Sequence, residues 1–188
     1  MANSQNVTTA KPKIGGAIFS APLGTVLPTN ATEELDTAFK ALGYVSEDGL
    51  TNSNSPEADK IKAWGGDTVA VVQTSKDDTF SYTLIESLNP DVLKEVYGEN
   101  NVTGTLETGI AIKATSEQLP THCLVIEMIL KGDILKRIVI PAGTVSEIGD
   151  ISYTDSDAVG YETTLDCVPD SEGVTHYEYI QSKQIAEG

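Results

Sequence analysis

The chain has 188 residues, of which 39% are hydrophobic and 21% charged, and its 12 basic and 28 acidic residues give a net charge of −16. This length and composition predict a globular domain with a proper core and exclude a disordered chain. The acidic excess excludes a protein that grips nucleic acid through Lys and Arg, since it would repel phosphates.

The start of the chain predicts an extended arm over residues 1–30. Residues 1–13 are polar and lack the apolar core of a secretory signal, and no apolar run approaches the roughly 18 residues of a membrane helix. The following "GGAIFSAPLGTVLP" mixes apolar residues with Gly and Pro, which favours an extended segment with bends over a helix.

The next segment, "NATEELDTAFKALG", predicts a short amphipathic helix. Asn30 or Thr32 can cap its start and Gly43 can end it. Its acidic residues follow the expected start, where the helix dipole favours them.

A polar, acidic stretch over residues 44–66 is expected to form a long loop. Loops of this length are uncommon in compact domains and usually serve a function or are disordered. The loop ends in "IKAWGGDTV", which holds Trp64, the only tryptophan of the chain. Gly65 and Gly66 suit a sharp turn into the strand that follows.

The sequence predicts that residues 67–182 form a β core that includes one helix. The runs "TVAVVQT" and "TFSYTLIE" predict strands on either side of a turn at "SKDD", and "TLETGIAIKA" predicts another strand. In "NPDVLKEVYG", Asn89 is a good cap, Pro90 suits the first helical position and Gly98 ends the segment. A helix is therefore expected over residues 90–97.

The strongest hairpin lies in "HCLVIEMILKGDILKRIVIPAG", where two β-rich runs meet at Gly132 and Asp133. Further strands are expected in "TVSEIGDISYT", "AVGYETTLDCV" and "VTHYEYIQS". The predicted fold is mainly β: an antiparallel β-sandwich or barrel flanked by a short α-helix, with an N-terminal arm and a long loop, in a single domain over residues 1–188.

Few residues point to catalysis. His122 and Cys123 are neighbours on a predicted strand, so they should face opposite ways and form a poor base and nucleophile. The acidic cluster "DISYTDSDAVGYE" fails the spacing of a calcium loop. The sequence therefore predicts no enzyme, no cofactor and no metal site. Cys123 and Cys167 can be two buried thiols or a disulfide.

One family resemblance covers residues 15 to about 100. "GAIFSAPLGTVLPTNATEELDTAFKALGYVSEDGL", the variable polar stretch after it and "IKAWGGDTV" together resemble the N-terminal third of the major tail proteins, or tail tube proteins, of long-tailed, non-contractile bacteriophages (siphophages). "SYTLIESLNPDVLKEVYG" is similar to the strand and helix that follow in that family. The remaining residues match only in being β-rich.

The resemblance implies a structural virion protein whose copies form hexameric rings stacked into a hollow tail tube. It implies a fold shared with the inner tubes of contractile tails and of type VI secretion. The expected partners are other copies, the tape measure protein, and the tail terminator and distal tail proteins. DNA would pass without specific binding, and no membrane would take part. The expected location is the virion tail, with assembly in the host cytoplasm.

Two groups of residues become candidate sites under this resemblance. Trp64, Gly65, Gly66 and Asp67 are expected to contact a neighbouring copy, although Trp64 could instead pack on its own core. Residues 138–181 contain nine acids and neither Lys nor Arg. Within them Glu162 and Asp166 share one strand face, and they line the channel or face outer solvent. The alternative function is a receptor- or carbohydrate-binding β-sandwich module of a virion.

Overall fold

The computed structural model describes residues 1–13 and 15–183. Its centre is an antiparallel hairpin of β8 (His122–Leu130) and β9 (Ile134–Ile148). Gly132 and Asp133 in the connecting turn have positive φ angles of 83° and 57°. The predicted hairpin is therefore confirmed, and so is the mainly β, antiparallel class with a short helix.

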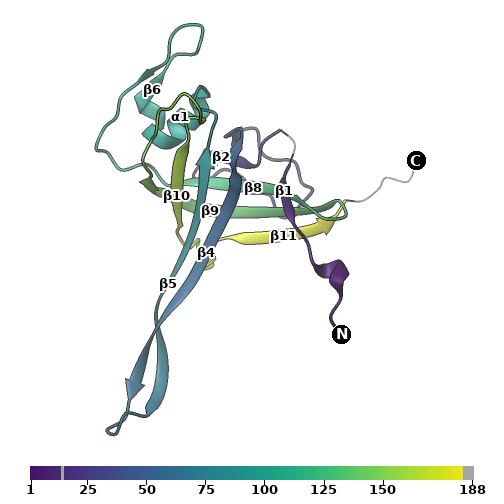
Figure 1. Ribbon diagram of the computed structural model, residues 1–188, viewed down its shortest axis with the longest axis vertical. Helices are drawn as coiled ribbons and strands as arrows, with labels where there is room; N and C mark the ends of the chain where they lie inside the picture. The colour runs from purple at the N-terminus through teal and green to yellow at the C-terminus, as the bar shows by residue number, and fades with distance from the viewer. Residues whose placement is uncertain (14, 184–188) are drawn as a thin grey trace, which may run out of the picture.

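The central hairpin organises a sheet of nine described strands, in which the path β3-β2-β8-β9-β10-β5-β4 is extended by β1 on β8 and by β11 on β9 (Figure 1). β1 and β2 pair with successive parts of β8, while β10 and β11 pair with successive parts of β9. The other strands of this sheet are β1 (Ala10–Pro12), β2 (Ile18–Pro22), β3 (Lys40–Ala41), β4 (Val45–Lys62), β5 (Thr68–Leu84), β10 (Tyr161–Cys167) and β11 (Tyr177–Ser182).

Helix α1 (Pro90–Tyr97) confirms the predicted helix and covers one side of the sheet. The Asn89 side chain accepts a hydrogen bond of 3.0 Å from the backbone N–H of Asp91, so the cap works as its sequence suggests. Val92, Leu93 and Val96 of α1 are buried in the main core. The sheet residues of that core include Phe80, Tyr82, Leu84, Leu124, Ile126, Ile140 and Leu165.

The predicted helix at the start of "NATEELDTAFKALG" is wrong: these residues form bends and turns that end in the short strand β3. The Asn30 side chain accepts the backbone N–H groups of Thr32 and Glu33, which offers the backbone an alternative to helical hydrogen bonds. Phe39 and Leu42 belong to two different core clusters. A helix would place them on one face, whereas the extended chain buries both.

The predicted loop over residues 44–66 is also wrong. β4 runs from Val45 to Lys62 and pairs along its length with β5, so the segment is half of a long hairpin. The turn predicted at "SKDD" lies inside the continuous strand β5. A ribbon with solvent on both faces needs no alternation of polar and apolar residues, which removes the pattern that marks a strand.

Two other strand predictions hold only in part. Of "TLETGIAIKA", only β7 (Ala111–Ile112) is a strand, and it pairs with β6 (Val102–Thr103) in a separate small sheet. The strand expected in "TVSEIGDISYT" ends at Ile148. The short 3-10 helices η1 (Ser4–Asn6) and η2 (Glu99–Asn101) complete the described elements.

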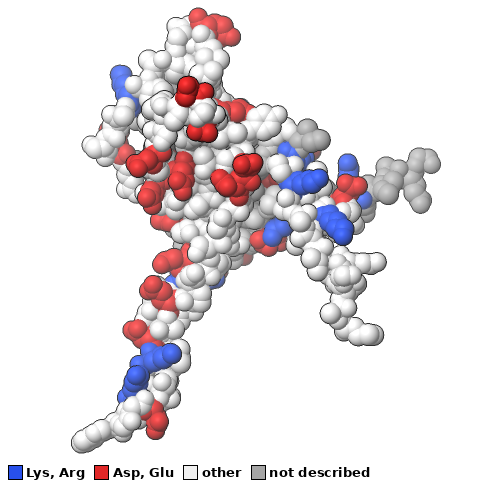
Figure 2. All heavy atoms as spheres, viewed as in Figure 1, with Lys and Arg blue, Asp and Glu red and all other residues white. Residues whose placement is uncertain are grey.

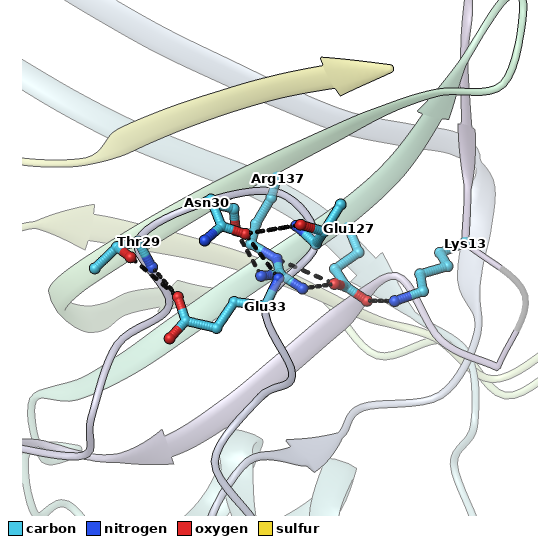
Figure 3. A network of polar contacts seen from close by, with 7 residues as sticks. Lys13, Thr29, Asn30, Glu33, Glu127 and Arg137 are labelled. Carbon is cyan, nitrogen blue, oxygen red and sulfur yellow. Dashed lines mark hydrogen bonds and ion pairs between the residues drawn. The ribbon is translucent and has the colours of Figure 1, made fainter. Parts of the chain in front are cut away.

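A buried ion pair crosses the central hairpin (Figure 3). Glu127 of β8 lies opposite Arg137 of β9, and the guanidinium donates two hydrogen bonds to one carboxylate oxygen. Arg137 also donates to the backbone oxygen of Asn30 at 2.7 Å, and Lys13 donates to the second Glu127 oxygen at 2.6 Å. One pair thus ties the N-terminal arm and the bend at Asn30 to the sheet.

We expect Arg137→Met to lower the free energy of unfolding by about 3–5 kcal/mol, because it leaves the Glu127 carboxylate buried beside a single, half-exposed lysine. The double variant Glu127→Leu, Arg137→Met should recover part of that loss. Urea denaturation measures both. Lys13→Met is the control and should cost at most about 1 kcal/mol. An Arg137→Met protein as stable as the control would contradict the assigned role.

Candidate assembly surface

The β4–β5 hairpin projects from the body as a two-stranded arm (Figure 1). Every residue from 51 to 74 is exposed, so in the described chain neither face of the outer arm is covered. At the tip, the backbone N–H of Gly66 donates to the oxygen of Ala63 at 3.0 Å, and that of Ala63 donates to the oxygen of Asp67 at 2.8 Å. Gly65 and Gly66 have φ angles of 123° and 99°, which side chains disfavour, so glycine is needed here.

Trp64 stands at this tip with its side chain wholly exposed, at 107% of the reference accessibility. The alternative that it packs on the core of its own subunit is therefore wrong. Ile61, Val69, Val71 and Val72 are exposed nearby on the two strands. They are spread over both faces of the ribbon, since Ile61 lies opposite Ala70 and so shares a face with Val72, whereas Val71 points to the other face. Several large apolar side chains exposed on one projection indicate an interaction site, because each is stabilised when it is covered.

The base of the arm is fixed by the buried carboxylate of Asp78. Asn52 of β4 donates to one of its oxygens at 2.8 Å. Thr175 donates to the other at 2.5 Å, and Nδ1 of His176 lies 2.6 Å from that same oxygen. Burial by itself would raise the pKa of Asp78, but these hydrogen bonds outweigh it and hold the pKa below its usual value. Sequence reasoning missed this group, since its four residues lie in three separate segments.

Glu162 and Asp166 point away from the core on β10, as predicted, while Tyr161, Thr163 and Leu165 are buried. Their cross-strand partners on β5 are Thr83 and Thr79. The same face continues with Ser81, Thr164 and Glu147. Strands β9, β10 and β5 thus present a surface of hydroxyls and carboxylates.

Charge is unevenly spread over the molecule, as Figure 2 shows. Acidic residues dominate the visible body, the arm shows residues of both signs, and basic residues also appear near the N-terminal segment. The arm carries Lys60, Lys62 and Lys76 against seven acidic residues, whereas the N-terminal segment carries Lys11 and Lys13 and no acid in residues 1–13. Of the two projections, only the N-terminal segment is therefore basic.

His122 and Cys123 face opposite sides of the sheet, as predicted. Nε2 of His122 lies 2.8 Å from Glu95 of α1, while the thiol of Cys123 donates to the backbone oxygen of Pro141. Burial alone would lower the pKa of His122, but the hydrogen bond and charge of Glu95 raise it. Cys123 and Cys167 are both free thiols in the structure. Among the described residues, no helix is long and apolar enough to cross a membrane.

A family model described as phage tail tube protein matches residues 1–187. The chain belongs to this family. Among curated proteins no match was found. Membership makes the chain a structural protein of the virion tail that associates with other copies of itself, and it confirms the resemblance seen in residues 15 to about 100.

The two groups of candidate residues occupy different parts of the subunit. Trp64 to Asp67 form the tip of the arm, whereas Glu162 and Asp166 lie on β10 in the body (Figure 1). The signal for the tip was the lone tryptophan beside two glycines. Lys60 and Lys62 lie on β4 just before the tip and were not predicted as part of the site. Their place in an otherwise acidic segment could have pointed to them.

We expect Asp78→Asn to lower the free energy of unfolding by about 2 kcal/mol at pH 7, because three side chains lose a charged acceptor. A carboxyl whose folded pKa is depressed contributes stability above its unfolded pKa and loses it as pH falls through the folded value. The difference between the two proteins should therefore shrink below about pH 4.

Urea denaturation at pH 7 and pH 3 measures this difference. The neighbouring, exposed Asp77→Asn is the matched control and should change the free energy by less than about 0.5 kcal/mol. Equal effects of the two substitutions, or a difference that grows in acid, would show that Asp78 does not fix the arm.

Proposed function

We propose that the subunit self-assembles into hexameric rings, that the rings stack into the hollow tail tube, and that DNA is delivered through this tube. The observation that carries the proposal is the projecting arm. Residues 51–74 are exposed and present Trp64 at the tip of the hairpin, an arrangement that a lone subunit leaves uncovered. Family membership supplies the tail as the setting.

Contacts of the arm with a neighbouring copy follow from its shape and chemistry. Trp64, Gly65, Gly66 and Asp67 form its end, so they reach another copy first. An indole side chain can bury about 150–250 Å² when it is covered. Because each copy carries one arm, a ring repeats this contact around its circumference, and many weak contacts then act together.

The acidic face of β10 is proposed to line the channel. Glu162 and Asp166 lie there among threonine and serine hydroxyls, and residues 138–181 contain no Lys or Arg. The screening length at physiological salt is roughly 8 Å, so wall charges act only on DNA that passes close to them. A repelling wall keeps DNA moving, because phosphates find no cation to bind.

The proposed partners beyond other copies are the tape measure protein, around which the tube would polymerise, and the tail terminator and distal tail proteins at the two ends. DNA would be conducted without specific binding. Assembly would take place in the host cytoplasm before the tail joins the capsid. The family supports these statements because it gives the tail as the setting of the subunit. The arm supports them because it can join one copy to the next.

Replacing residues 55–77 with an Asn-Gly turn should give a folded subunit that no longer forms tubes. The cut joins Asn54 to Asp78, which are cross-strand partners, so a two-residue turn can close the shortened hairpin. Thermal unfolding and electron microscopy measure the two results. A full-length chain with Glu57→Gln is the control for altered arm charge. Normal tubes from the shortened chain would contradict the proposed role of the arm.

Glu162→Lys combined with Asp166→Lys should leave tubes of normal length but slow DNA ejection, because each lysine can bind a passing phosphate. The defect should ease as salt rises. The matched control is Asp155→Lys with Asp157→Lys, which makes the same charge change in an exposed loop. Ejection from purified virions is followed with a DNA-binding dye. Equal ejection rates for the two double variants would place β10 away from the channel.

A further inference from the structure

A hollow lies between α1, β2 and the start of β8. We infer that Trp64 of one copy seats in the hollow between α1, β2 and the start of β8 of the next copy. This inference rests on the proposed function, since it names the receiving site of the contact through which copies assemble.

The hollow has a volume of about 440 Å³. This lies within the range of about 300–1,000 Å³ that is typical of sites for ligand-sized groups. Its walls are mainly apolar. The apolar lining includes Pro22, Leu23, Ala38, Leu42, Leu119 and Pro120.

Three polar residues in the lining, Ser20, Glu95 and His122, already have hydrogen-bond partners within the subunit. Glu95 accepts a hydrogen bond of 2.9 Å from Ser20 and lies 2.8 Å from Nε2 of His122. His122 in turn lies 3.1 Å from the backbone oxygen of Pro120. An incoming aromatic group therefore meets a rigid site in which these side chains are held in place, so little conformational entropy is lost on binding.

Charges of both signs lie in the lining of the hollow and beside the tip. Three carboxylates, those of Asp91, Glu95 and Glu99, line the hollow beside two lysines, and one of these lysines is paired with Glu99 at 2.8 Å. The incoming tip carries Lys60 and Lys62 but also Asp59 and Asp67, so it has no net charge. The match between tip and hollow therefore rests on apolar contact, and charges at the edge act only as individual pairs. Rim charges of this kind act mainly on the encounter rate and the choice of partner.

The positions of tip and hollow require two copies. Figure 1 shows α1 at one end of the long axis and the tip at the other, with the arm pointing away from the body. A contact between different patches of identical subunits is heterologous, and such contacts build closed rings or open stacks. Either outcome fits a repeating tube, whereas a symmetric dimer would need the same patch on both copies.

A second hollow fits the tip less well. It lies next to the acidic face of β10 and is lined by Thr144, Ser146, Glu147 and Asp166 among others. An indole buried there would lie against carboxylates and hydroxyls, and taking these out of water costs free energy. The hollow beside α1 is therefore the better match for an apolar side chain.

Fluorescence tests the inference directly, because Trp64 is the only tryptophan. In the free subunit the indole is exposed, so its emission should be that of a hydrated tryptophan and acrylamide should quench it readily. When purified full-length protein forms tubes, the emission should move to shorter wavelength and quenching should fall several-fold. Trp64 that stays exposed in tubes would overturn the inference while leaving the proposed function intact.

The hollow is tested with Leu23→Lys, which replaces part of its apolar wall with a charge that an incoming indole would have to desolvate. Leu23 is 58% exposed, so the subunit should still fold. The concentration needed for assembly should rise by about tenfold or more, as for loss of a hot-spot contact. Leu106→Lys, at a residue 62% exposed and outside the hollow, is the matched control and should change that concentration less than about twofold.

A mixed crosslink separates this hollow from other places that could bury the indole. Copies with Ala63→Cys are mixed with copies with Ala38→Cys, and oxidation of the tubes should join the two types through one disulfide. Burial of Trp64 without this disulfide, and with normal assembly of Leu23→Lys, would show that the tip docks elsewhere. A wild-type protein that never assembles, alone or with tail partners, would instead remove the proposed function.

Discussion

The register of the whole sheet depends on the pair between Glu127 and Arg137. The two residues face each other across the central hairpin, and both are buried. A slip of β8 against β9 would leave both charges unpaired in the interior, at a cost of several kcal/mol. Since β1 and β2 pair with β8, and β10 and β11 with β9, the register set here is passed to both halves of the sheet.

Paired polar groups and strand contacts at its base also explain why the arm can project from the body. An isolated two-stranded hairpin is marginally stable in water. This one gains stability from its base, where β5 pairs with β10 and where Asp78 collects hydrogen bonds from Asn52, Thr175 and His176. The body thus fixes the direction of the arm, while the tip stays free to meet a partner.

A paired ribbon is also a better assembly element than the flexible loop that its composition suggests. Ordering a loop at the moment of contact costs conformational entropy for every residue fixed. Because β4 and β5 pair when the subunit folds, most of this entropy is already lost before the arm meets a partner. The apolar burial at the tip can then contribute more fully to association.

The sequence predicts this structure well where one face is buried and poorly where none is. The alternation of apolar and polar residues predicted β10, and a strong turn sequence predicted the β8–β9 hairpin. A capping residue followed by an apolar stripe predicted α1. The arm has no such pattern because both of its faces meet solvent. The helix expected before Gly43 failed because Asn30 binds the backbone locally and because Phe39 and Leu42 bury on different sides of the sheet.

The sequence indicated which residues form the candidate site but not where they lie relative to one another. A lone tryptophan beside two glycines marked the tip, yet nothing local showed that eighteen residues of β4 would carry it away from the body. The Asp78 group and the hollow beside α1 join segments far apart in the chain. Long-range contacts of this kind follow from the packing of the whole sheet, and no local pattern encodes them.

Charge then limits which contacts between copies are favourable. Each subunit carries −16, so two bodies that approach face to face repel each other. The arm does not escape this repulsion, because β4, β5 and the turn between them carry three lysines against seven acidic residues. Screening limits the repulsion to roughly 8 Å at physiological salt, which makes it a matter of local contact. The attraction between copies must therefore come from apolar burial, and the exposed apolar side chains near the end of the arm are suited to supply it.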